Sequence, residues 1–478
     1  MSYRLPLLAA LLLALLLASV AASSSQRYFD YYFTDTDIVD GEILDQLRQV
    51  RLQVDQHDYD TAVALMEGLY EAIEPERISS HSHARLLSNA GLLKAVNGEP
   101  VRGMLLIGQA IEWIETTQGP YDELLIDLLT LQGVIASDQD EFEVAEDNLR
   151  RAQHIAHRLG GVYTRRQLKI VDLLTGLNLS RNFTLEADRQ QRFNLKINEQ
   201  VYGHNSEELV PVLEKLGSYF ADRGNTIPLR IVSASQIPQV DPGASTEQYR
   251  VGLFRESIEL YERAIKIIED NYGANDLRLV PALKGLADTR LKQRTSRRYA
   301  EQAMERMLEI VASNPATDIA DHARALVDLA DIYTVTSDRR AHATYLEAWN
   351  LLDAHPELDD VKNELFGMPR RLYPEKNYVI RLDRLPSHVD GDTTVPLYAD
   401  VEFSVIDDGR VSDVRVIDGN VPNEEKNYIR KRLGYSRYRP RIVDGEFVET
   451  QGLMLHQAFE YVEPERSMEL NVNTNTLP

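Results

Sequence analysis

The sequence predicts a multidomain protein: an all-α superhelical solenoid of helix pairs, followed by a small α+β domain. Two observations lead to this fold class. Small residues recur with a fixed long period in the middle of the chain, and after Pro356 the apolar residues change to the two-residue alternation of β-strands. The 478 residues are enough for two or three domains, and 43% hydrophobic with 27% charged residues is the balance of a chain that buries a core.

The solenoid is predicted by small residues at matching offsets. Gly133 follows Gly91 by 42 residues, and each glycine opens the same pattern: Gly91, Gly103 and Ala110, then Gly133, Ala145 and Ala152. Small residues there let two helices approach closely, while larger side chains fill the gap to the next pair. This pattern resembles the tetratricopeptide repeat in a form with long helices. We expect about seven helix pairs between Gly41 and Ala354, in a solenoid of residues 41–356.

One segment interrupts this repeat between Phe220 and Glu247. It contains two glycines and three prolines, which stop helices: Gly224, Pro228, Pro238, Pro242 and Gly243. We expect an insertion at about residues 221–247, a long loop inside one repeat of the kind that is either functional or mobile.

The first residues have the composition of a signal peptide. Arg4 precedes an uncharged, Leu- and Ala-rich run from Leu5 to Ala22, which ends in small residues at the spacing that a signal peptidase reads. We expect residues 1–22 to be cleaved and the protein to lie in the periplasm of a Gram-negative cell. The alternative is an uncleaved anchor at the short limit for a membrane span, on the periplasmic side of the inner membrane.

Residues 23–40 form an aromatic and acidic N-terminal segment. Its aromatic residues are Tyr28, Phe29, Tyr31, Tyr32 and Phe33. They either cap the first repeat or form a disordered, adhesive segment. Asp35, Asp37 and Asp40 have the wrong spacing for a calcium loop, so helix capping by Asp37 or Asp40 is expected.

The C-terminal domain is expected at residues 372–462. Leu397–Val405 alternates as a half-buried strand, Asp407–Gly409 is a tight-turn signal, and valines from Val411 to Val416 continue as a second strand. A helix at Glu424–Leu433 and a third strand at Phe447–Tyr461 complete a three-stranded antiparallel sheet with one helix. Residues 463–478 are expected to be a disordered tail.

Three short sequences in this region resemble the C-terminal domain of TonB: Tyr373-Pro374, Asp408-Gly409-Arg410-Val411 and Arg437-Tyr438-Arg439-Pro440. The resemblance implies that the domain binds a partner by β-strand addition, in which a partner segment pairs with a sheet edge. The edge is expected on the third strand, within Val448–Phe459. The expected partner-binding residues are Val448, Thr450, Gly452, Met454, Arg437, Tyr438 and Arg439.

The chain departs from TonB in two respects. The apolar run lacks the polar helix face that couples TonB to a proton-driven motor, and helical repeats stand in place of its proline-rich spacer. We therefore expect a periplasmic adaptor that binds proteins, such as outer-membrane or cell-envelope proteins. The alternative is an inner-membrane-anchored, TonB-type energy transducer for outer-membrane transport. Membrane contact is expected only if residues 1–22 remain.

No enzyme motif stands out, so no catalytic or cofactor-binding residues and no cofactor are expected. The chain has no cysteine, which excludes disulfides and thiolate metal sites. His154 and His157 are read as part of a solvated helix face rather than a metal site. A net charge of −23 argues against nucleic acid.

One basic stretch stands out in this acidic chain: Arg430, Lys431, Arg432, Arg437, Arg439 and Arg441. It either meets an anionic partner or docks within the chain onto the acidic solenoid.

Overall fold

The computed structural model describes residues 32–35, 38, 40–74, 77–226, 246–293, 297–373, 380–382 and 396–461. Four predicted features fall outside these ranges: the signal peptide at 1–22, most of the segment 23–40, the interior of the insertion, and the tail at 463–478. The chain divides into two compact units, Met1–His204 and Asn205–Pro478.

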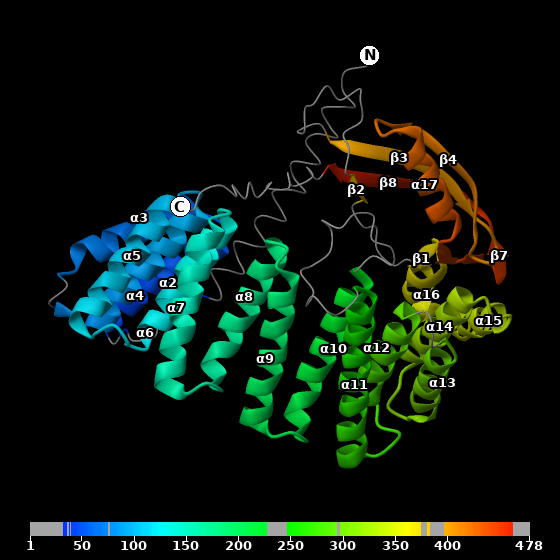
Figure 1. The fold of residues 1–478 in the computed structure, drawn as a ribbon, viewed down its shortest axis with the longest axis horizontal. Coiled ribbons are helices and arrows are strands. Elements are labelled where there is room, and N and C mark those ends of the chain that lie inside the picture. Colours follow the sequence, from blue (N-terminus) through cyan, green and yellow to red (C-terminus); the bar gives the residue numbers. More distant parts are fainter. Residues whose placement is uncertain are drawn as a thin grey trace, which may run out of the picture. The chain divides into compact units, whose positions relative to one another are not determined.

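The first unit consists of successive helix pairs (Figure 1). Its helices are α2 (Gly41–Asp55), α3 (Tyr59–Ala72), α4 (Ser80–Val96), α5 (Pro100–Thr117), α6 (Leu124–Asp138), α7 (Phe142–Gly160), α8 (Leu168–Ser180) and α9 (Thr184–Tyr202). A short 3-10 turn, Arg165–Gln167, leads into α8. As expected, Asp40 caps α2, since its carboxylate accepts from the backbone N–H groups of Glu42 and Ile43.

The second unit continues the same arrangement. Its helices are α10 (Val210–Thr226), α11 (Thr246–Tyr272), α12 (Leu279–Lys292), α13 (Arg297–Ser313), α14 (Ile319–Thr336), α15 (Arg340–Asp353) and the short α16 (Asp359–Phe366). From α2 to α15 the described residues form seven helix pairs, the number that the 42-residue period predicts. Helices α10 and α11 form one of these pairs, and residues 227–245 between them lie outside the described ranges.

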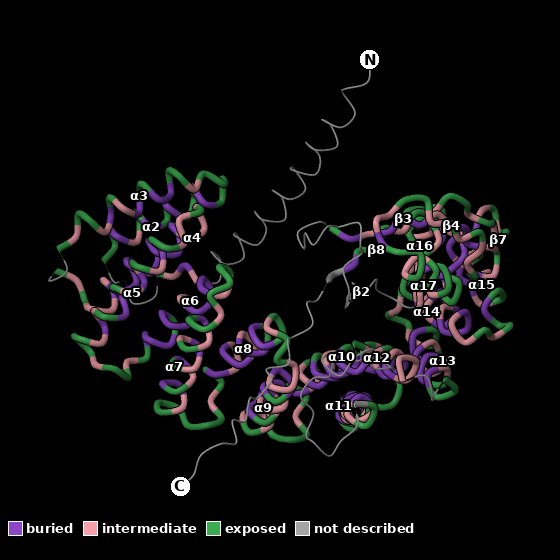
Figure 2. Tube along the Cα trace, turned by 45° about the horizontal axis from the view of Figure 1, so that its top comes forward, coloured by how far each residue is buried: buried purple, intermediate pink, exposed green. Residues whose placement is uncertain are grey.

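Close helix approach depends on glycine, as the repeat pattern predicts. A Cβ on Gly91 would lie 2.7 Å from the carbonyl oxygen of Gly103, so the backbones of α4 and α5 nearly touch. In the second unit the ring of Tyr261 on α11 occupies the space beside Gly217 of α10 and Gly285 of α12. Figure 2 shows the resulting burial along helices α10 and α12. No described helix has the length and apolar character needed to cross a membrane.

The C-terminal sheet differs from the prediction. Its main sheet has four strands in the order β2-β8-β3-β4, formed by β2 (Ile380–Leu382), β3 (Leu397–Val405), β4 (Val411–Gly419) and β8 (Thr450–Tyr461). The expected antiparallel arrangement is present in β8-β3-β4. The expected number of three strands is wrong, because β2 adds a fourth strand parallel to β8. A three-residue strand carries no readable alternation, so only its pairing partner defines it.

Two further strand pairs flank this sheet. They are β1 (Arg370–Tyr373) with β5 (Arg437–Arg439), and β6 (Arg441–Val443) with β7 (Glu446–Val448). The predicted third strand is therefore divided at Glu449 into β7 and β8. Helix α17 (Asn423–Gly434) packs Ile429 and Leu433 into the core formed by β3. The predicted hairpin and helix are confirmed, although β4 extends beyond Val416 to Gly419.

The glycine contacts give a stability prediction. In Gly285→Ala the new Cβ would lie 2.2 Å from the Tyr261 ring, so we expect a loss of about 1–3 kcal/mol in the free energy of unfolding. Gly176→Ala in α8 is the control, because a Cβ there has open space and alanine favours the helix by about 1 kcal/mol. Urea denaturation measures both. Equal effects would contradict the close-packing role of Gly285.

Candidate partner-binding site

The C-terminal domain is fixed to the last helix pair by a buried arginine. Arg439, on β5, is 2% exposed. Its Nε donates to Asp331 Oδ1 at 2.9 Å and its Nη2 donates to Asp331 Oδ2 at 2.6 Å. Its Nη1 donates to the carbonyl of Leu365 at 3.2 Å. Asp331 lies on α14 and Leu365 on α16, so one guanidinium joins the domain to two helices.

Tyr345 on α15 completes this cluster. Its hydroxyl donates to Asp331 Oδ1 at 2.7 Å and accepts from the Thr334 hydroxyl at 3.1 Å. Burial, together with the nearby Asp331 carboxylate, raises the pKa of Tyr345 well above its ordinary value. The phenol therefore remains a neutral donor to Asp331. Arg439 and Tyr345 both hold the Asp331 carboxylate in a fixed geometry. The sheet therefore docks on the last helix pair in one defined position.

Aromatic packing extends the same contact. The ring of His342 on α15 lies 4.3 Å from the ring of Phe447 on β7, and His342 Nε2 lies 3.2 Å from the carbonyl oxygen of Asp407. No sequence pattern indicates these partners, because His342 and Phe447 lie far apart along the chain. Asp331 itself follows the small-residue motif of the last repeat without any distinguishing neighbour.

Three of the predicted partner-binding residues therefore face into the chain or lie near this docking contact. Arg439 is held by Asp331, and Tyr438 is 7% exposed with its ring 5.6 Å from that of Phe403. Arg437 is half-buried and pairs with Tyr373 of β1. Of the six residues in the basic stretch, Arg439 supports the alternative of docking within the chain, whereas Arg430 and Lys431 are exposed on α17.

The other four predicted residues lie along two strands. Val448 belongs to β7 and pairs with Arg441. Thr450 begins β8, and Gly452 has a φ of +70°, at a bulge in the pairing with β3. Met454 is 56% exposed. Among the described residues, β8 pairs along its outer edge only with β2, from Phe459 to Tyr461. The stretch from Gln451 to His456 has no described partner strand on that side.

The face of the sheet opposite α17 carries cross-strand polar pairs. The Tyr398 hydroxyl donates to Asp418 at 3.0 Å, His456 Nδ1 lies 2.6 Å from Asp400, and Glu402 pairs with Arg415 at 3.1 Å. Because these groups satisfy one another at the surface, they read as a solvated face that sets strand register rather than as a reactive site.

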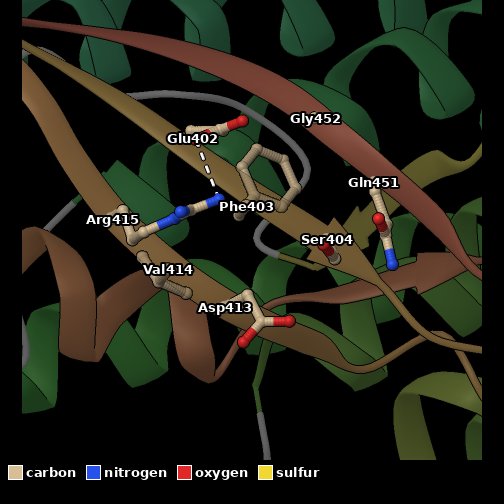
Figure 3. A pocket seen from close by; sticks show the side chains of 8 residues that line it. All are labelled: Glu402, Phe403, Ser404, Asp413, Val414, Arg415, Gln451 and Gly452. Carbon is tan, nitrogen blue, oxygen red and sulfur yellow. Dashed lines mark ion pairs between the residues drawn. The ribbon is translucent and has the colours of Figure 1, made fainter.

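A shallow hollow opens on this sheet where β3, β4 and β8 meet (Figure 3). Ser404, Asp413 and Gly452 line it together with the Glu402–Arg415 ion pair. Asp413 and Gly452 both have positive φ, at +51° and +70°. The hollow therefore lies where the pairing of β3 is irregular with both of its neighbours, β4 and β8.

No metal-binding cluster of His, Asp or Glu occurs among the residues that the structure describes. His154 packs its ring 6.2 Å from that of Tyr121, and His157 packs 6.3 Å from Phe193. The two histidines therefore contact different aromatic residues.

No protein-family model matches this chain, and no curated protein matches it either. Among solved structures, BtubC (BKLC) from P. vanneervenii is 16% identical over 59% of this chain and 92% of its own, with a TM-score of 0.32. A putative kinesin light chain from Podosopora anserina with TPR-like repeats is 12% identical over 58% and 98%, with a TM-score of 0.27. The quorum sensor NprR from B. thuringiensis is 10% identical over 70% and 95%, with a TM-score of 0.29. At these TM-scores the fold assignment rests on the helix pairs of the structure itself.

The docking contact can be tested by mutation. Arg439→Leu leaves the Asp331 carboxylate without its guanidinium, so we expect a loss of about 3–5 kcal/mol in the free energy of unfolding. Arg430→Leu is the control, since Arg430 is exposed and bonds only to Asn427 nearby. The urea-induced unfolding transition of the second unit gives the free energy of unfolding of both variants. Similar stabilities for the two variants would contradict the docking role of Arg439.

Proposed function

We propose that the protein is an exported interaction adaptor, active in the periplasm of a Gram-negative cell. Its helix pairs form a scaffold, and its C-terminal sheet takes up an extended partner segment by strand addition at the outer edge of β8. The partners are proteins of the cell envelope, and the chain itself supplies no catalysis.

The stretch of β8 from Gln451 to His456 carries this proposal. It pairs with β3 on one side and has no described partner strand on the other. A strand edge of this kind presents backbone N–H and C=O groups that an added segment can pair with. The added strand would run in line with β2, which already occupies the end of the same edge.

The opposite edge of the sheet is less suited to strand addition. On β4 the backbone of Asp413 is left-handed, with φ at +51°, and the pairing with β3 shifts register twice. Bulges twist an edge away from further pairing and are one way in which proteins protect an edge. Charged side chains at Asp413, Arg415 and Asp418 add to this protection.

The order of elements supports the TonB-like interpretation of this domain. The hairpin of β3 and β4, the helix α17 and the strand β8 follow one another in the order that the resemblance implies. The ion pair between Arg439 and Asp331 on α14 is a further feature, which the resemblance does not imply. A partner held at β8 would be held at a fixed position relative to the last helix pair, which suits an adaptor.

Site-specific photo-crosslinking tests the edge. A photoreactive residue in place of Met454, on β8, is expected to give discrete adducts in cells, whereas one in place of Ile417, on β4, is not. The two positions form a matched pair, because both are apolar and their exposed fractions are 56% and 55%. Adducts from Ile417 alone, or from both positions equally, would overturn the choice of edge.

Intact mass spectrometry of the protein from cell fractions tests export. We expect a periplasmic species that begins near Ser23, because the small residues before it form the cleavage signal. A membrane-bound species that retains Leu5–Ala22 would instead favour the anchored energy transducer, and binding to inner-membrane motor proteins would then be the next measurement.

A further inference from the structure

The N-terminal segment lies in the first unit against helices to which it does not belong. The structure describes Tyr32–Asp35 and Ile38 of this segment. Phe33 is 6% exposed and Ile38 is 7% exposed, and both belong to the hydrophobic core of the first unit. Tyr32 packs against the same core. Tyr32 and Phe33, the two described members of the aromatic cluster, therefore pack on the core of the repeats.

Asn89, on α4, forms hydrogen bonds to both backbone polar groups of Thr34 in this segment. Its Oδ1 accepts from the N–H of Thr34 at 3.3 Å, and its Nδ2 donates to the carbonyl of Thr34 at 2.9 Å. A carboxamide that bonds to both backbone groups of one residue acts as a neighbouring β-strand would. Such bonding does not depend on which side chain that residue carries. Asn89 is 0% exposed. A buried amide is costly unless it is hydrogen-bonded, so this site requires a backbone segment in front of it.

Lys169, two helix pairs further along on α8, contacts the preceding residue. Its Nζ lies 3.7 Å from the centre of the Tyr32 ring, at cation–π distance. Burial lowers the pKa of Lys169 to about 8, and the Asp127 carboxylate on α6 opposes that shift. Asp127 also pairs with the buried Arg85 of α4 at 2.8 Å. The first helices of three successive pairs, α4, α6 and α8, thus place polar groups along the path of the segment.

We propose that this face of α4, α6 and α8 is a binding groove for a peptide with adjacent aromatic residues, which the chain's own Tyr32–Asp35 occupy. Asn89 takes the main chain of the peptide, Lys169 takes one aromatic ring, and the core of the first unit takes the second. The groove is separate from the edge of β8 and does not depend on it. The partner is a segment of another protein with the same chemistry, and it binds by displacing Tyr32–Asp35.

The chemistry of the contacts makes the segment displaceable. They comprise two hydrogen bonds to one residue, a cation–π contact and apolar burial. A tethered segment competes at an effective concentration of about a millimolar or more, so a free peptide meets a largely filled groove. Loosening the tethered segment should therefore expose the groove.

The probe is a fluorescein-labelled synthetic peptide of residues 27–40, titrated with the full chain and followed by fluorescence anisotropy. The double variant Tyr32→Ala, Phe33→Ala is expected to bind it at least tenfold more tightly than the unaltered chain. Adding Asn89→Ala should weaken that binding at least tenfold. Asn178→Ala is the matched control and should leave binding unchanged, because Asn178 is a buried asparagine that donates to its own helix at Leu174.

Failure of the folded double variant to bind the peptide would overturn the proposal and make Tyr32–Asp35 a permanent part of the core. Exchange of the segment between two copies, seen as a concentration-dependent dimer, would overturn it in favour of a second copy as the occupant. If the double variant does not fold, hydrogen exchange of the Thr34 amide in the unaltered chain decides. Exchange faster than that of the α4 interior supports displacement, and exchange only by global unfolding overturns it.

Discussion

The buried charge of Arg439 requires an oppositely charged partner, and this requirement fixes the position of the C-terminal domain on the last helix pair. Removing a guanidinium from water costs several kcal/mol, which is offset only by a partner with good geometry. Asp331 supplies two acceptors and Leu365 a third. Because Tyr345 holds the same carboxylate from α15, the position of the sheet and the packing of the last helix pair depend on each other. The basic stretch thus has one buried member, and its exposed members stay on α17.

The two surfaces proposed for binding share a physical principle. The edge of β8 and the side chain of Asn89 both recognise peptide backbone, which every protein segment carries. Backbone recognition gives affinity without selecting a sequence, so selectivity must come from neighbouring side chains. Met454 on β8 and Lys169 beside Tyr32 are placed for that role. Under the two proposals, one chain would hold two peptide segments, one in each of its units.

The sequence prediction succeeded for elements whose signals lie within a few neighbouring residues. Gly91 and Gly103 touch across one pair, and the same spacing recurs through the chain, so periodicity revealed the contact. The hairpin at Asp407–Gly409 and the helix α17 are likewise decided by neighbouring residues. The short strands β1, β2 and β5 were not predicted, because each pairs with a strand far away in the sequence. Strand β6 was not predicted either, since three residues carry no readable alternation. The predicted third strand is divided at Glu449 because β7 pairs with β6, whereas β8 pairs with β3.

The sequence by itself determined the helix pairs, their number and the start of the C-terminal hairpin, because these depend on side-chain size and turn chemistry over a few residues. It also named the basic stretch, with two alternatives for its partner. Only the tertiary structure decided that Arg439 meets Asp331 and that Thr34 meets Asn89. Both contacts join residues 55 or more positions apart. Buried polar groups choose partners by position in space, and that position exists only once the helices have packed.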